Sequence, residues 1–139
     1  MYNQNMRNFL FVLLLVASVY NSAFSQQQQN YRDVNATEFK ALSDTLKNAV
    51  LLDLRTPDEL KQGMIVNATN LDYFMKDFED RVAKLDPSKT YLLYCASGGR
   101  SGETMELMKS RGFKQVYNLD GGFIQWKKQK MPIVPYQKP

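Results

Sequence analysis

From residue 31 onward, short apolar runs of strand length alternate with segments whose apolar residues recur at helical spacing. Residues 49–54 are nearly all apolar, as in a strand buried on both faces, and residues 90–94 and 115–119 form two further strand-like runs. A shorter candidate strand covers residues 65–68. This alternation predicts one α/β domain with a mostly parallel central sheet and helices on both faces.

Capping residues mark where the first two helices should begin. Asn35 followed by Glu38 favours a helix start, and apolar residues then recur at positions 39, 42 and 46. The segment Thr56-Pro57-Asp58-Glu59 combines a capping residue, an early proline and a glutamate at the capping-box position. It predicts a short helix that ends near residue 62, before Gly63.

Three more helices are expected in the rest of the chain. Residues 73–85 carry apolar side chains at spacings of four, four and three, which predicts one helical stripe made of Phe74, Phe78, Val82 and Leu85. A helix over residues 100–111 should end at Gly112, a typical C-cap residue. The last helix should begin at the glycine pair at positions 121 and 122.

The first residues are typical of an export signal. Arg7 precedes an apolar run over residues 9–17, and small residues at Ala23 and Ser25 suit signal peptidase. The run is shorter than the ~20 residues that a spanning helix needs, although an uncleaved anchor or a core helix stays an alternative. We therefore expect a signal peptide over 1–25, cleaved after Ser25, a Gln-rich linker over 26–30 and the folded domain over 31–139. The protein would be periplasmic or secreted, with no stable membrane span after cleavage.

Composition narrows the possible chemistry. The 18 basic and 14 acidic residues are scattered and give a formal charge of +4, too mild a bias to indicate nucleic acid as a partner. The chain has no histidine, so it lacks the usual general base and the commonest metal ligand. Its single cysteine, Cys95, allows no internal disulfide, CxxC pair or thiolate zinc site. We expect no metal and no cofactor, and any cysteine chemistry must use Cys95.

Cys95 lies where an α/β sheet usually binds ligands, between a buried strand and the start of a helix. Gly98 and Gly99 can adopt positive φ, so that the N–H groups of a short loop converge on one point. The helix amino terminus and Arg100 add positive potential there. These surroundings favour the thiolate of Cys95, although a cysteine at a strand end is often only a small buried hydrophobic residue.

A thiolate formed in this way could attack the outer sulfur of a donor such as thiosulfate and become a persulfide. A second nucleophile, cyanide or a thiol, would then remove that sulfur. The expected partners are therefore a small sulfur-donor anion and a nucleophilic acceptor, which could be a protein, and we expect a monomer. Two alternatives stay open. One is a persulfide carrier or redox-sensing module that acts with a partner protein. The other is a phosphatase or arsenate reductase.

Three motifs in the chain resemble, in the same order, those of the rhodanese homology domain. They are the Asp53-x-Arg55 strand end with its acidic helix over residues 52–60, the cysteine loop over 94–101, and the closing motif over 112–123 with Trp126. The resemblance covers about residues 50–132 and implies a rhodanese-like fold and a single-domain sulfurtransferase. It also implies a Cys95 persulfide whose sulfur is held by the backbone of Ala96, Ser97, Gly98, Gly99, Arg100 and Ser101.

Two details of the resemblance affect the expected reaction. Four residues separate Cys95 from Arg100, as in the sulfurtransferases, whereas the related phosphatase and arsenate reductase domains have five. Met64 stands where the family usually has histidine, which affects local packing more than activity. For Asp53 and Arg55, an ion pair that orders the strand end is the favoured interpretation, and direct substrate contact is the alternative.

Overall fold

The computed structural model describes residues 30–137. The expected signal peptide over 1–25 and most of the expected linker lie outside the described residues, and Asn30 already belongs to the first strand. Within residues 30–137, no helix combines the length and the apolar character that crossing a membrane requires.

The central sheet has five strands in the order β1-β6-β5-β2-β4, and every pairing in it is parallel. The strands are β1 (Asn30–Val34), β2 (Val50–Asp53), β4 (Thr69–Asn70), β5 (Thr90–Tyr94) and β6 (Gln115–Leu119). The expected mostly parallel α/β fold is therefore confirmed. Because the strands are parallel, their carboxyl ends share one edge of the sheet, and β5, which precedes Cys95, lies in the middle of it.

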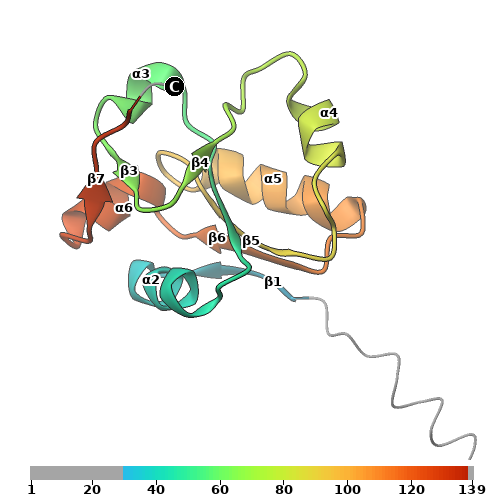
Figure 1. The fold of residues 1–139 in the computed structure, drawn as a ribbon, viewed down its shortest axis with the longest axis horizontal. Coiled ribbons are helices and arrows are strands. Elements are labelled where there is room, and N and C mark those ends of the chain that lie inside the picture. The colour runs from blue at the N-terminus through green and yellow to red at the C-terminus, as the bar shows by residue number, and fades with distance from the viewer. Residues whose placement is uncertain (1–29, 138–139) are drawn as a thin grey trace, which may run out of the picture.

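Helices cover both faces of this sheet, as expected (Figure 1). Side chains of β5 alternate between the faces. Tyr91 and Leu93 join an apolar cluster with α4 (Phe78–Ala83) and α5 (Gly99–Ser110), whereas Leu92 and Tyr94 join one with α2 (Ala36–Thr45) and α6 (Gly122–Lys128). The sheet is thus buried on both sides, which explains the continuous apolar runs in its strands.

The predicted caps are confirmed. The Asn35 side chain accepts a hydrogen bond from the Glu38 N–H at 2.9 Å, at the start of α2. Thr56 and Glu59 form both bonds of a capping box at the start of α3 (Pro57–Leu60). Gly112 has a φ of +81° after α5, where the predicted C-cap glycine stands.

The predicted helical stripe over residues 73–85 is wrong for its first part. The helix α4 covers only Phe78–Ala83, and the Phe74 side chain is 67% exposed. The Asp72 carboxylate accepts a hydrogen bond from the Phe74 N–H at 3.0 Å, which forms a local turn that competes with a helix. Spacing alone could not reveal that turn.

The short strand expected at residues 65–68 is displaced. The strand β3 (Met64–Ile65) instead pairs antiparallel with β7 (Ile133–Val134) in a separate two-stranded sheet. Asn67 then has a φ of +65°, and this turn separates β3 from β4. The run is interrupted because a left-handed residue cannot continue a strand.

Candidate functional site

Cys95 follows the last residue of β5, and its side chain is buried, with 1% exposed. The Gly98 N–H donates a hydrogen bond to the Cys95 Sγ at 3.2 Å, and the Ser101 hydroxyl lies 3.4 Å from the same sulfur. Two donors from the loop and from the first turn of α5 therefore point at one sulfur atom.

The carbonyl groups of Cys95 and Ala96, at the start of the loop, accept hydrogen bonds from α6. The N–H groups of Phe123 and Ile124, at the start of α6, donate to the carbonyl oxygens of Cys95 at 2.9 Å and Ala96 at 3.0 Å. These two carbonyl oxygens therefore point toward α6 and away from the sulfur, while N–H groups further along the loop point toward the sulfur. The amino end of α6 therefore helps to orient the loop with its N–H groups toward the sulfur.

Glycine is required at two positions of this arrangement. Gly98 has a φ of +96°, and a Cβ there would lie 3.3 Å from the Leu119 carbonyl oxygen. Gly122 has a φ of +55°, and a Cβ there would lie 2.6 Å from the Cys95 carbonyl oxygen. Side chains at either position would separate the loop from the β6–α6 connection beneath it.

The pKa of the Cys95 thiol is lowered by its surroundings. Burial raises this pKa, but hydrogen bonds from the Ser101 hydroxyl and from the N–H groups of Ser101, Ser97 and Gly98 together lower it further than burial raises it. The loop therefore favours the thiolate, which is the nucleophilic form of cysteine, without a neighbouring general base.

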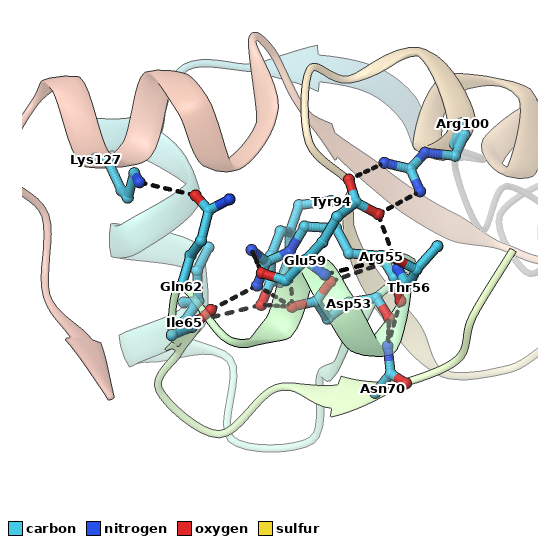
Figure 2. A network of polar contacts seen from close by, with 11 residues as sticks. Asp53, Arg55, Thr56, Glu59, Gln62, Ile65, Asn70, Tyr94, Arg100 and Lys127 are labelled. Atoms are coloured by element: carbon cyan, nitrogen blue, oxygen red, sulfur yellow. Dashed lines mark hydrogen bonds and ion pairs between the residues drawn. The ribbon is translucent and has the colours of Figure 1, made fainter. Parts of the chain in front are cut away.

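Arg100 does not act as a free positive charge. Its guanidinium donates to both oxygens of the Glu59 carboxylate, at 2.8 and 2.6 Å, and Figure 2 shows these two groups facing each other. This pairing is the main reason why the pKa of Glu59 falls to about 2. Glu59 also belongs to the capping box of α3, so one carboxylate connects that helix to the start of α5.

Asp53 and Arg55 form the expected ion pair, which is buried at the end of β2 with an N–O distance of 2.6 Å. The Arg55 guanidinium also donates to the carbonyl oxygens of Glu59 and Gly63, at 3.2 and 2.7 Å. The Tyr94 hydroxyl donates to the Asp53 carboxylate (Figure 2). Arg55 is only 1% exposed, so it orders the strand end and α3 and presents no surface to a substrate.

Sequence reasoning missed several residues of this site. The amides of Phe123 and Ile124 gave no signal beyond the glycine pair that precedes them, and Glu59 was recognised only as a cap. Asn118, whose amide donates to the Gly98 carbonyl oxygen at 3.2 Å, gave no signal at all. Met64 is buried in β3, between Gly63, whose carbonyl oxygen accepts from Arg55, and Ile65, whose N–H donates to the Tyr94 hydroxyl. Among residues 30–137, no three Asp, Glu or Cys side chains are grouped as a metal site would need.

Comparisons with known proteins agree with this geometry. The Rhodanese-like domain family matches residues 35–129. The chain is 34% identical over 104 residues to a sulfurtransferase of Allochromatium vinosum, covering 73% of this chain and 95% of that protein. The crystal structure of a rhodanese-related protein from Thermoplasma volcanium superposes with a TM-score of 0.64 at 30% identity, covering 76% of this chain and 100% of that one. With its family match over most of the domain and its cysteine loop in place, the chain belongs to the rhodanese-like domain family.

Proposed function

We propose that the protein is a sulfurtransferase that moves sulfane sulfur from a donor anion such as thiosulfate, through Cys95, to a nucleophilic acceptor such as cyanide or a thiol. The observation that carries this proposal is the pair of donors, the Gly98 N–H and the Ser101 hydroxyl, aimed at the Cys95 sulfur. The likeness to a sulfurtransferase at 34% identity supports the same reaction class.

In the first step, the Cys95 thiolate attacks the outer sulfur of thiosulfate. A sulfur–sulfur bond to Cys95 forms, the bond within thiosulfate breaks, and sulfite leaves with the electron pair. The product is a persulfide whose outer sulfur carries negative charge, and the N–H groups of the loop stabilise that charge as they stabilise the thiolate.

In the second step, the acceptor attacks the outer sulfur of the persulfide. Its bond to Cys95 breaks, and the electron pair returns to Cys95 as the thiolate. Cyanide becomes thiocyanate, and a thiolate acceptor becomes a persulfide. Neither step requires proton transfer by the enzyme, which is consistent with a chain that contains no histidine.

The Cys95→Ser variant tests this function. It should form no thiocyanate from thiosulfate and cyanide, because serine cannot carry the transferred sulfur, while its unfolding transition stays close to that of the wild type. Equal thiocyanate formation by both proteins would reject the proposal.

A persulfide carrier that serves a protein partner is the second candidate. Phe74 and Ile124 are the most exposed large apolar side chains within residues 30–137, at 67% and 60%. The centroid of the Phe74 ring lies 5.4 Å from the Arg100 guanidinium carbon, and the Ile124 N–H donates to the Ala96 carbonyl oxygen. Exposed apolar groups beside a reactive loop suit contact with another protein.

Mass spectrometry and kinetics separate the two candidates. A carrier should retain one added sulfur on Cys95 after purification and turn over negligibly with small molecules. Rapid turnover with thiosulfate and cyanide alone would instead favour the enzyme.

We also propose that the protein is exported, on the basis of the signal-like pattern over residues 1–25. Expression of the full chain in a Gram-negative host should yield periplasmic protein whose measured mass corresponds to a chain that starts at Gln26. Full-length protein confined to the cytosol would contradict this proposal.

A further inference from the structure

Asn118 is a polar residue at a position of β6 where an apolar residue would be expected. It shares a face of the sheet with Val116, which belongs to the apolar cluster beneath α5, and it is only 4% exposed. Within residues 30–137 its Oδ1 has no hydrogen-bond partner. A buried acceptor without a partner costs stability, so this asparagine is not explained by packing.

The amide nitrogen of Asn118 is fully engaged. It donates to the Asp33 carboxylate at 2.8 Å and to the Gly98 carbonyl oxygen at 3.2 Å. Both partners are acceptors, so the nitrogen and oxygen of the amide cannot be exchanged without placing Oδ1 against a carboxylate. Asn118 thereby connects β1, β6 and the cysteine loop.

The Gly98 carbonyl oxygen is the point where this contact affects the reactive sulfur. It accepts from the Gly102 N–H at 2.9 Å as well as from Asn118. The Ser101 hydroxyl lies 3.3 Å from the same oxygen and 3.4 Å from the Cys95 Sγ, and it has one proton to donate. The carbonyl and the sulfur therefore compete for that proton.

We propose that Asn118 is a positioning residue that reserves the Ser101 hydroxyl proton for the Cys95 sulfur. A carbonyl oxygen has two lone pairs, and Gly102 and Asn118 together occupy both of them. The Ser101 proton is then left to the sulfur. Without Asn118, one lone pair becomes free, and the hydroxyl divides its proton between the carbonyl oxygen and the sulfur.

The charged groups around the sulfur do not supply this effect. Arg100, on α5, interacts with Cys95 but is paired mainly with Glu59 of α3, and Asp33 of β1 accepts from the Asn118 amide. An effect of Asn118 on the rate of sulfur transfer would rest on the proposed function. Its effect on the Cys95 thiol does not, because the reactivity of that thiol can be measured without any sulfur donor.

A double-mutant cycle of Asn118→Leu and Ser101→Ala tests the inference. Leucine has a similar size and removes the unpaired oxygen, so the fold should be retained. The readout is the rate of Cys95 alkylation by iodoacetamide as a function of pH, with the unfolding transition of each variant measured in parallel. Each single variant should lower the rate at neutral pH by roughly three- to tenfold. In the Ser101→Ala background, the Asn118→Leu change should add almost nothing.

A purely structural role for Asn118 gives a different result. If the amide only stiffens the loop, Asn118→Leu should lower the alkylation rate by the same factor with or without the Ser101 hydroxyl, and that outcome would overturn the inference. An unchanged rate in Asn118→Leu alone would also overturn it. Should the leucine variant fail to fold, Asn118→Val repeats the cycle with a β-branched side chain that suits a strand.

Discussion

At the scale of single residues, the reactivity assigned to Cys95 results from opposing effects. Burial alone would favour the neutral thiol, whereas the Ser101 hydroxyl and three N–H groups favour the thiolate and together have the larger effect. The glycines matter because they let the backbone come close enough for those N–H groups to reach the sulfur. Gly122 is the most demanding of them, because it lies against the carbonyl groups of Cys95 and Ala96.

Gly122→Ala should therefore damage both the fold and the site. Its Cβ would lie 2.6 Å from the Cys95 carbonyl oxygen, and its φ of +55° is unfavourable for alanine. We expect a loss of about 2 kcal/mol or more in the free energy of unfolding, measured with urea, together with slower alkylation of Cys95.

Gly99→Ala is the matched control. A Cβ at Gly99 has nothing within 4 Å, and the residue lies in the first turn of α5. Its free energy of unfolding should stay within about 1 kcal/mol of the wild type and could increase, because alanine is the better helix former. Equal losses of unfolding free energy in the two variants would show that the clash at Gly122 does not cause the destabilisation of Gly122→Ala.

The sequence could predict part of the site at this scale. Cys95 was identifiable because it carries the chain's one thiol, and Gly98 because glycine readily adopts a positive φ. Gly99, expected to share that role, does not adopt a positive φ. Asn118 and the pairing of Arg100 with Glu59 were not identifiable, since each depends on which distant segments meet. Residues 59 and 100 are brought together only by the folded sheet, and no local pattern records that contact.

At the scale of elements, α3 connects the two sides of the site. Glu59 binds Arg100 at the start of α5, and the carbonyl oxygen of the same residue accepts from Arg55 at the end of β2. A four-residue helix has little stability of its own, so these contacts and its capping box must hold it in place.

Glu59→Gln should weaken this connection in a pH-dependent way. The folded-state pKa of Glu59 is lowered to about 2, so its stabilisation is fully present above the ordinary glutamate pKa of about 4.3 and is lost as the pH falls through about 2. We expect the variant to be less stable by about 1 to 2 kcal/mol at pH 7, with the difference shrinking in acid.

Asp58→Asn is the control for Glu59→Gln, because it removes a charge from the same helix. Within residues 30–137, Asp58 pairs only with Lys61, and both side chains are exposed. Urea unfolding at pH 7 should resolve no difference from the wild type. A stability difference for Glu59→Gln that stays constant down to pH 2 would contradict the assigned ion pair.

Arg55→Met tests the buried network at the end of β2. The change leaves the Asp53 carboxylate buried without its cation, which should cost about 3 to 5 kcal/mol in the free energy of unfolding. Replacing both residues, as Asp53→Leu with Arg55→Met, should cost less than the single change. Arg81→Met breaks an exposed pair with Asp77 and serves as the control, and urea unfolding should resolve little or no loss for it. Equal losses for Arg55→Met and Arg81→Met would reject the structural role.

Sequence patterns predicted some of the helices and strands and missed others. The main strands and the caps were predictable because buried parallel strands are continuously apolar and because capping residues act locally. β1 was missed because its residues are mostly polar and only Val34 is buried, and because its strand conformation depends on pairing with β6. Residues 73–77 were misassigned because Phe74 matched a helical spacing while Asp72 favoured a turn.

At the scale of the whole molecule, the fold brings separate segments to one sulfur atom. The loop after β5 carries the donors, α6 binds the loop carbonyls, β6 supplies Asn118, and α3 holds Arg100 through Glu59. The lowered thiol pKa is thus a property of the folded chain and not of the loop sequence alone. Unfolding should abolish it.

The titration of Cys95 in native and in urea-unfolded protein tests this account most directly. Because the chain has one cysteine, the rate of alkylation against pH reports this thiol alone. In urea the midpoint should lie near the free value of about 8.5, and in the native protein it should lie clearly lower. A native midpoint equal to or above the unfolded one would contradict the claim that the folded loop stabilises negative sulfur at Cys95.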